Sequence, residues 1–355
     1  MHLRIPGPTE CPREVLEAIG KQMINHRGPE CAELIADLTE RTKKVFQTHN
    51  DLLMLTCSGT GGLEAAIVNF FSHGDTILAT TIGNFGNRFA EIARRHGAKT
   101  ILLEKPWGED IAPEELDEAL RAHADASAVL ITHNETSTGV TNDLRELARV
   151  ARAHGKLVLV DAVSSMAAIP VQTDEWDLDV VVGASQKGFM CPPGLAMVSV
   201  SERAWSAYGR ASMGRYYLDL GIAKKSFEKR QTPTTPAISI FFGLDRALNL
   251  ILSEGLQNVF SRHRRVAERC RAGIASLGWQ LFAKTHCASN AVTAVTVPPP
   301  LDAASVIRSL RENYRIVVAG GMGACAGKLI RIGHIGRVEE SDVDAVIRAL
   351  GNLYG

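Results

Sequence analysis

The chain has 355 residues, 45% of them hydrophobic and 22% charged, and its 39 Lys and Arg balance its 39 Asp and Glu. This composition predicts a globular protein large enough for two domains, and it argues against a nucleic-acid partner or an anionic-membrane surface. With no apolar stretch of membrane-spanning length, no signal-like N-terminus and no metal-type spacing among its seven cysteines, the sequence predicts a cytoplasmic protein without a metal site.

A glycine-rich turn at residues 57–62, Cys-Ser-Gly-Thr-Gly-Gly, precedes an apolar stripe with helical spacing at positions 63, 66, 67 and 70. A turn that opens a helix offers free backbone N–H groups and the positive end of the helix dipole to a phosphate. Ser58 and Thr60 add hydroxyl donors. The turn therefore predicts a phosphate site, although a tight connection without a ligand has a similar composition. The glycines do not follow the order Gly-x-Gly-x-x-Gly, which makes a dinucleotide site a poor interpretation.

Apolar runs alternate with helical patterns through the first two thirds of the chain. Buried strands are expected at residues 77–79, 129–131, 157–160 and 180–182, and a helix at 144–151. Such alternation predicts an α/β domain with a mostly parallel sheet. In sheets of this kind, ligands bind beyond the carboxyl ends of the strands.

Phe85 lies between two glycines in residues 82–87, Ile-Gly-Asn-Phe-Gly-Asn, just ahead of a predicted helix. The flanking glycines would let a flat ring approach the face of the phenyl group, as stacking requires. A buried loop aromatic is an equally good explanation of this residue in isolation.

A polar cluster follows the strand at 129–131, in the order Thr-His-Asn-Glu-Thr-Ser-Thr-Gly at residues 132–139. Polar side chains gathered at the carboxyl end of a strand suit a ligand site better than a core. A turn rich in Ser and Thr is a serious alternative for any one of them.

Two neighbouring apolar strands end near an acid and an amine. Asp161 directly follows the strand at 157–160, and Lys187 follows the strand at 180–182 in a run of small residues, Gly-Ala-Ser-Gln-Lys-Gly. Pyridoxal phosphate requires this pair, an amine for a Schiff base and an anion that keeps its pyridine nitrogen protonated. Taken singly, Asp161 would be explained as a turn cap and Lys187 as a solvated loop residue.

The regular alternation of strand and helix patterns ends at about residue 245. The remaining patterns are a helix at 242–252, a basic helix at 262–265 expected to be a solvated face, a strand at 291–297, a proline turn at 298–300, and helices at 302–312 and 339–350. They predict a smaller α+β domain. The expected division is an N-terminal arm at 1–14, a large cofactor-binding domain at 15–245 and a small C-terminal domain at 246–355.

Arg331 lies inside an apolar strand at residues 328–333, Lys-Leu-Ile-Arg-Ile-Gly. A guanidinium in such a run must be paired, and its planar fork fits a carboxylate. The partner is either an acid of the chain itself or the carboxylate of a substrate.

Together these motifs resemble the class V aminotransferases, a group of fold-type I pyridoxal-phosphate enzymes, and specifically their alanine–glyoxylate and serine–pyruvate branch. The resemblance runs nearly end to end, through residues 6–9, 45–48, 58–60, 135–139, 160–161, 185–187, 192–194, 217–219, 234–236 and 331–333. It implies a large domain with a mostly parallel sheet and a smaller α+β C-terminal domain. The implied activity is transfer of an amino group from alanine or serine to glyoxylate or pyruvate by a ping-pong mechanism.

The resemblance also implies residue roles. Lys187 would bind the cofactor and move the substrate proton, Asp161 would hold the pyridinium nitrogen, and Arg331 would bind the α-carboxylate of the substrate. The further cofactor contacts would be Val163 and Phe85 on the ring faces, Thr136 on the ring hydroxyl, Ser58, Gly59, Thr60 and Gln186 on the phosphate, and Thr234 on the phosphate of the neighbouring subunit. A homodimer with shared active sites is thus implied. Gln231 and Phe85 depart from the tyrosine and tryptophan of some relatives, which weakens any transfer of fine substrate preference.

The choice of substrate is less constrained. His26-Arg27 resembles a pair near the side-chain pocket of phosphoserine aminotransferases, so Arg27 would favour an acidic or phosphorylated donor. A local ion pair with Glu30 is the competing and slightly favoured explanation. Relatives that use phosphoserine, aspartate or aminoethylphosphonate are therefore alternatives.

Three other functions compete with transamination. A cysteine desulfurase-like lyase is the runner-up of a different class, but its candidate nucleophile Cys325 is only six residues from Arg331, too short a loop to deliver a thiol, so Cys325 is expected to be structural. A nicotinamide oxidoreductase is the third interpretation and a non-catalytic binding module the fourth; a yellow colour of the purified protein that an amino acid bleaches would exclude both.

Overall fold

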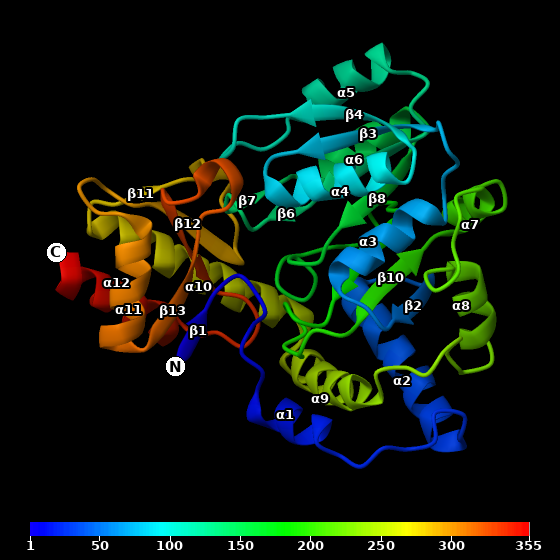
Figure 1. Ribbon diagram of the computed structural model, residues 1–355, viewed down its shortest axis with the longest axis horizontal. Coiled ribbons are helices and arrows are strands. Elements are labelled where there is room, and N and C mark those ends of the chain that lie inside the picture. The colour runs from blue at the N-terminus through cyan, green and yellow to red at the C-terminus, as the bar shows by residue number, and fades with distance from the viewer. Residues whose placement is uncertain (355) are drawn as a thin grey trace.

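The computed structural model describes residues 1–354, which form two large sheets, each with its own helices (Figure 1). The larger sheet has the order β2-β10-β9-β8-β5-β3-β4. Strands β4, β3, β5, β8 and β9 pair in parallel, whereas β10 is antiparallel to both β9 and β2. The bounds are β2 Asp51–Leu55, β3 Thr76–Thr81, β4 Lys99–Glu104, β5 Ala128–Thr132, β8 Leu157–Asp161, β9 Val180–Ala184 and β10 Ala196–Val200. The expected α/β class with a mostly parallel sheet is confirmed.

The central strands read as uninterrupted apolar runs because both faces of the sheet are buried. In β5, Val129 and Ile131 pack into one hydrophobic cluster, while Ala128 and Leu130 pack into another. Successive side chains of a strand point to opposite faces, so each cluster lies on its own side of the sheet. Polar groups are therefore gathered at the ends of these strands rather than on the faces of the sheet.

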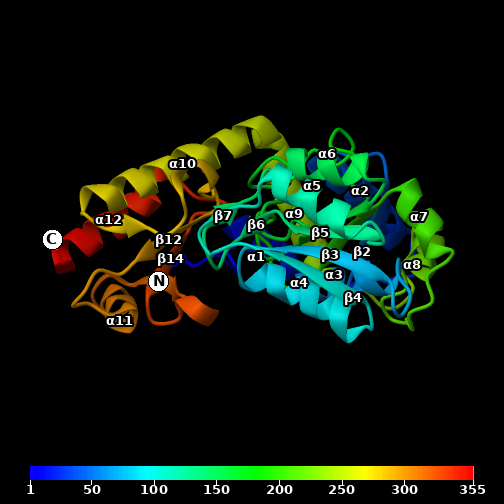
Figure 2. The same ribbon diagram turned by 90° about the horizontal axis from the view of Figure 1, so that it is seen from above.

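Two layers of helices cover these faces (Figure 2). Residues of α2, α5, α6 and α9 join one cluster, and residues of α3, α4, α7 and α8 join the other. The bounds are α1 Arg13–Ile19, α2 Pro29–Phe46, α3 Gly59–Val68, α4 Asn84–Arg95, α5 Pro113–Ala122, α6 Leu144–Ala153, α7 Glu202–Tyr208, α8 Leu220–Phe227 and α9 Ile238–Glu254. A two-stranded ribbon, β6 Asn134–Glu135 and β7 Val140–Thr141, follows β5.

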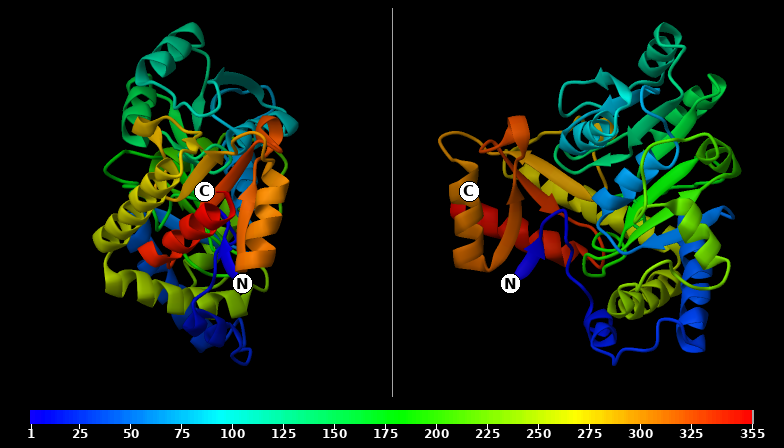
Figure 3. Two further views of the ribbon diagram at one scale, coloured as in Figure 1. Left: turned by 90° about the vertical axis from the view of Figure 1, so that its left-hand side faces the viewer. Right: turned by 45° about the vertical axis from the view of Figure 1, so that its right-hand side comes forward.

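The smaller sheet has the order β1-β13-β14-β12-β11 and is covered by three helices. Its elements are β1 His2–Arg4, α10 Leu256–Ser276, β11 Gln280–Leu281, β12 Val292–Thr296, α11 Ala303–Tyr314, β13 Ile316–Gly320, β14 Leu329–Gly333 and α12 Glu340–Tyr354, with short 3-10 helices at Thr285–Cys287 and Gly323–Cys325. The N-terminal strand β1 pairs in parallel with β13, so the two ends of the chain share this sheet (Figure 3).

Two features of the structure bear on the expected domain boundaries. Helix α9 runs without a break through residue 245, and the first strand of the expected arm belongs to the C-terminal sheet. The division at 1–14, 15–245 and 246–355 stays a prediction. Among residues 1–354, no helix is both long enough and apolar enough to cross a membrane.

The basic helix at 262–265 is only partly solvated, contrary to expectation. His263 is fully buried, and its Nδ1 lies 2.7 Å from the carbonyl of Val259. Arg262 is paired with Glu254 and also donates to the carbonyl oxygen of Gly336. The run therefore presents one side to solvent and the other to the protein, as the helical period of α10 requires.

Candidate active site

A cavity of about 390 Å³ lies at the carboxyl ends of the parallel strands, bounded by both sheets and by the N-terminal segment. It brings together most of the residues that the sequence singles out, namely Gly59, Thr60, Phe85, Thr136, Asp161, Val163, Gln186, Lys187 and Arg331. Ser58, Thr234 and Arg27 are not among its lining residues. Residues more than 300 positions apart in the chain thus meet at the edge that the fold reserves for ligands.

Asp161 is the last residue of β8 and is 6% exposed. Its Oδ1 accepts a hydrogen bond of 3.0 Å from the backbone N–H of Val163. The pKa of Asp161 is raised to about 6, mainly by burial and also by the charge of Glu135, against the opposing effects of the Val163 hydrogen bond and the charges of Lys187 and Arg88. A buried carboxylate with few internal donors is suited to a cationic partner from outside the chain.

Lys187 lies just beyond β9, the strand that pairs with β8. Its Nζ donates a hydrogen bond of 2.7 Å to the carbonyl oxygen of Pro6. Burial lowers the pKa of Lys187 to about 8; the charge of Asp161 opposes this shift, and Arg331 and Arg88 reinforce it. The lowered pKa increases the share of neutral, nucleophilic amine near neutral pH.

The predicted phosphate turn is where helix α3 begins. Ser58 is the N-cap residue, and its side chain makes no capping hydrogen bond. A Cβ at Gly59 would lie 2.7 Å from Cγ2 of Val163, so the backbone at this point approaches the cavity wall as closely as only glycine permits. The buried Oε1 of Gln186 has no hydrogen-bond partner among the described residues. The uncapped N-terminus of α3 and the close backbone approach at Gly59 fit a ligand with an anionic group, whereas the Gln186 oxygen is an acceptor and requires a donor.

Arg331, on β14, is 8% exposed. Its Nε donates to the carbonyl oxygen of Gly320 at 2.7 Å and its Nη1 to that of Thr136 at 3.0 Å. Burial lowers the pKa of Arg331, and the charge of Glu135 opposes the shift. Among residues 1–354 no carboxylate forms an ion pair with this guanidinium. Two carbonyl dipoles hold the fork in place and leave its charge for a carboxylate in the cavity.

Arg27 and Thr234 are related to each other rather than to this cavity. Arg27 Nη1 donates to the carbonyl oxygen of Thr232 at 2.6 Å and to Oε1 of Gln231 at 3.2 Å. It bonds to this segment and not to Glu30. Thr234 is exposed and follows the segment directly. The substrate role of Arg27 and the phosphate role of Thr234 stay predictions.

Sequence reasoning did not assign roles to two cavity-side residues. Arg88 places its guanidinium 4.9 Å from the centre of the Phe85 ring, and its Nη1 lies 3.4 Å from Oγ1 of Thr60. Arg88 is three residues after Phe85 on α4, and residues at this spacing lie on the same side of a helix. The spacing could therefore have predicted that Arg88 lies near Phe85. Glu135 is completely buried beside the cavity, and its signals in the sequence were its place in the polar cluster at 132–139 and in the motif at 135–139.

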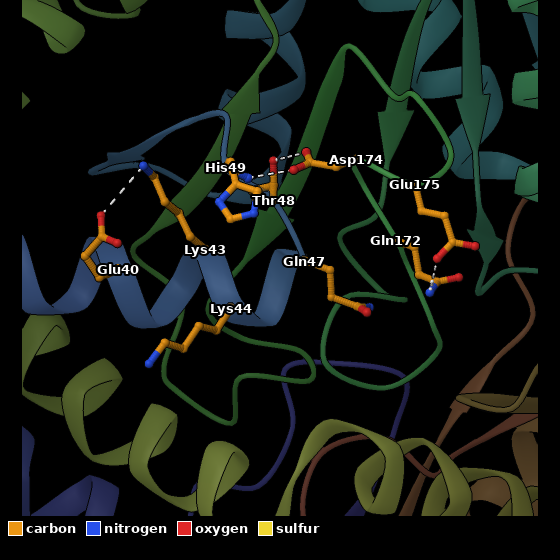
Figure 4. Close-up of a pocket in the computed structure, with 9 residues that line it drawn as sticks. All are labelled: Glu40, Lys43, Lys44, Gln47, Thr48, His49, Gln172, Asp174 and Glu175. Carbon is orange, nitrogen blue, oxygen red and sulfur yellow. Dashed lines mark hydrogen bonds and ion pairs between the residues drawn. The ribbon is translucent and has the colours of Figure 1, made fainter.

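A second cavity, of about 500 Å³, lies at the end of α2 and is lined by polar residues, most of them exposed or half-buried (Figure 4). Its groups bond to one another: Thr48 Oγ1 donates to Asp174 at 2.5 Å, and Glu40 pairs with Lys43 at 3.7 Å. None of the residues predicted from the motifs lines it. Mutual pairing of this kind leaves little for a ligand, so the site at the sheet edge is the functional candidate.

Comparison with known proteins defines the class. The sequence profile of the aminotransferase class-V family matches residues 1–346, and the chain belongs to this family. It is a pyridoxal-phosphate-dependent aminotransferase with the fold-type I architecture.

Individual relatives span nearly the whole chain. A protein named soluble hydrogenase, small subunit, from Synechococcus sp. (strain PCC 6716) is 43% identical over 98% of this chain and 91% of its own length. A serine–glyoxylate aminotransferase from Methylorubrum extorquens is 37% identical over 96% of this chain and 87% of its own. The crystal structure of an alanine–glyoxylate aminotransferase from Nostoc sp. superposes with a TM-score of 0.95 at 33% identity, covering 99% of this chain and 95% of that one.

Proposed function

We propose that the protein moves an amino group from a small amino acid, alanine or serine, to glyoxylate or pyruvate by a ping-pong mechanism. The observation that carries the proposal is the meeting of Lys187, Asp161 and Arg331 in one cavity. An amine, a buried acid and a carboxylate-binding guanidinium are the groups that amino-acid chemistry on pyridoxal phosphate requires. Similarity to a serine–glyoxylate and an alanine–glyoxylate aminotransferase supports these substrates.

The residues of the cavity fit the cofactor. Bound pyridoxal phosphate supplies an electron sink that makes the Cα proton of the donor acidic. Asp161 would hold the ring nitrogen, Phe85 and Val163 would cover the ring faces, and Thr136 would reach the ring hydroxyl. The start of α3 at Ser58, Gly59 and Thr60 would receive the phosphate, and the side-chain NH₂ of Gln186, which lines the same cavity, would be a further donor to it.

Lys187 and Arg331 would act on the substrate. Lys187 would take the proton from the Cα of the donor and give it back later in the same half-reaction. Its pKa of about 8 permits both proton transfers near neutral pH. Arg331 would bind the α-carboxylate of the donor in the first half-reaction and that of the 2-oxo acid in the second. The carbonyl oxygens of Gly320 and Thr136 would keep the guanidinium oriented during both.

A homodimer with shared active sites in the cytoplasm belongs to the same proposal. Thr234 is exposed and does not line the cavity of its own chain, which supports a contact with the cofactor phosphate of a second subunit. In the test, two variants that are each expected to be inactive, Lys187→Ala and Thr234→Glu, are mixed and allowed to exchange subunits, so that mixed dimers form. If the residues act in different subunits, each mixed dimer contains one intact site and activity returns. Failure to recover activity in demonstrated mixed dimers would contradict the shared site.

The substrate proposal is tested by following the cofactor absorbance of the purified enzyme during single half-reactions. Alanine and serine are compared with aspartate, phosphoserine and aminoethylphosphonate as donors. The proposal requires the small neutral amino acids to react fastest. Faster reaction of an acidic donor would instead favour the alternative in which Arg27 selects the side chain.

The lyase alternative is disfavoured by the surroundings of Cys325. Its side chain is 6% exposed and packs with Ala294 and Leu329. Burial raises the pKa of its thiol, which is the opposite of what a nucleophilic cysteine needs. Absence of sulfide release from cysteine would agree with a structural role.

A further inference from the structure

Glu135 has a completely buried carboxylate that the proposed chemistry does not use. Its Oε2 accepts hydrogen bonds from the backbone N–H groups of Phe85 at 2.8 Å and Gly86 at 3.0 Å. Its Oε1 accepts from the backbone N–H of Ser137 at 3.0 Å and from the hydroxyl of Ser137 at 2.6 Å. Two donors on each oxygen leave the carboxylate with a fixed orientation.

The first two donors belong to the first turn of α4. The N-cap of this helix is Gly83, which has no side chain to offer. Ser137 Oγ accepts from the N–H of Asn84 at 2.9 Å, so Glu135 and Ser137 together satisfy three successive N–H groups at the start of the helix. A negative charge at this end also matches the helix dipole. A Cβ at Gly83 would lie 2.5 Å from Cγ of Glu135, so only glycine allows this approach.

The loop that Oε1 of Glu135 holds, at residues 136–137, also contacts Arg331, the proposed substrate-binding arginine. The carbonyl oxygen of Thr136, between the two residues that share the carboxylate bonds, accepts from Arg331 Nη1 at 3.0 Å. Burial raises the pKa of Glu135, and the hydrogen bonds from Ser137, Gly86 and Phe85 oppose that shift because they stabilise the ionised carboxylate. Among residues 1–354, no cation forms an ion pair with Glu135.

We propose that Glu135 is a positioning residue that fixes Phe85 and Arg331 relative to each other, so that the ring-stacking wall and the carboxylate-binding corner keep one spacing. This inference rests on the proposed roles of Phe85 and Arg331. One carboxylate does this because each of its oxygens holds a different segment, α4 through Oε2 and the loop at 136–137 through Oε1. Small misplacements of positioned groups are costly for catalysis.

Glu135→Gln tests the proposal with little change in volume. An amide has only one acceptor oxygen, so its NH₂ group must face either the two N–H groups of α4 or the N–H of Ser137. We expect KM to rise about tenfold for both the amino donor and the 2-oxo acceptor, with a smaller change in kcat. The visible circular dichroism of the bound cofactor should also weaken, since it reports the packing of Phe85 on the ring.

Asp179→Asn is a control at another buried carboxylate, one that also forms an ion pair with Arg203. Asp179 is 2% exposed, and its carboxylate accepts from the N–H of Val158 at 2.8 Å and from the hydroxyl of Ser201 at 2.8 Å, at the opposite end of the same sheet. It should lower the free energy of unfolding but leave KM and the cofactor dichroism unchanged. If Glu135→Gln behaves in the same way, Glu135 only stabilises the fold and the proposal is wrong.

Ser137→Ala keeps the test decisive should Glu135→Gln not fold. It removes the hydroxyl that joins Oε1 of Glu135 to the N–H of Asn84, and it should raise both KM values in the same direction but less strongly. Unchanged KM values in Ser137→Ala would then overturn the proposal. A wild-type enzyme without any transamination would overturn the proposed function and this inference together, whereas wild-type kinetics in Glu135→Gln would overturn the inference alone.

Discussion

The Nζ of Lys187 donates a hydrogen bond of 2.7 Å to the carbonyl oxygen of Pro6, 181 residues earlier in the chain. The same segment crosses the lysine so closely that a Cβ on Gly7 would lie 2.3 Å from Nζ and 2.6 Å from Cδ. The N-terminal segment is therefore a wall of the active site that holds the reactive amine. Strand β1 connects this wall to the small sheet that carries Arg331.

Gly7→Ala should lower kcat/KM for transamination strongly and lower the free energy of unfolding only modestly. Gly7 has φ +140°, so alanine adds backbone strain of about 1–3 kcal/mol and also collides with Lys187. Gly74→Ala is the control, because Gly74 has φ +88° with open space around it, so only strain is added. Unfolding curves and kcat/KM are measured for both variants. A similar kcat/KM for the two would show that contact with Lys187 is unimportant.

Lys187→Ala should abolish transamination and leave a folded protein that still binds pyridoxal phosphate. The change removes the covalent attachment and the proton carrier together, while the contacts proposed for the phosphate remain. After borohydride reduction, mass spectrometry should find the cofactor covalently retained on the wild type and not on the variant. Lys156→Ala, on the surface of the same half, serves as control. Measurable turnover by purified Lys187→Ala would refute the assignment.

The sequence was informative where chemistry is local. Asp161 and Lys187 were found because each follows an apolar strand, and the pairing of β8 with β9 brings those strand ends together as expected. The glycine-rich turn likewise opens a helix, because residues 63–70 carry a helical stripe. Hydrophobic period and turn composition suffice for such features.

Contacts between distant segments were out of reach. Nothing in Pro6 or Gly7 indicates that they touch Lys187, and nothing in residues 2–4 indicates pairing with residues 316–318. Likewise, the burial of His263 follows from which face of α10 packs inward, whereas a run of four basic residues only suggests exposure. Tertiary packing decides these cases, and the local pattern is compatible with several outcomes.

Asp161→Asn should remove most of the activity and yet stabilise the cofactor-free protein at neutral pH. A neutral amide cannot keep the ring nitrogen protonated, so the electron sink weakens. The stability effect follows from the pKa of Asp161, which burial raises to about 6. Between the ordinary aspartate pKa of about 4 and this value, the folded state keeps a proton that the unfolded state has released. The contribution of Asp161 to stability therefore falls as pH rises through that window.

Denaturant unfolding of the cofactor-free wild type and Asp161→Asn across pH 4 to 7 measures this effect. Most other titrating groups cancel in the difference between the two curves. The free energy of unfolding of the wild type should fall relative to that of Asp161→Asn as the pH rises to about 6, and the difference should then level off. A difference that does not change with pH would mean that the Asp161 carboxyl titrates at its ordinary value and is not strained by burial.

Arg331→Lys should impair both half-reactions while the cofactor absorbance in the resting enzyme stays the same. Removing one partner of a buried, hydrogen-bonded charge pair costs about 2–5 kcal/mol, and an ammonium cannot reproduce the planar fork that the carbonyl oxygens of Gly320 and Thr136 hold. We expect kcat/KM to fall at least about thirtyfold for the amino donor and for the 2-oxo acceptor alike. Arg271→Lys is the control, since Arg271 also donates to a carbonyl, that of Ser289, but does not line the cavity. Loss confined to one half-reaction would mean that donor and acceptor bind their carboxylates at different groups, and Arg88 would then be the first residue to test.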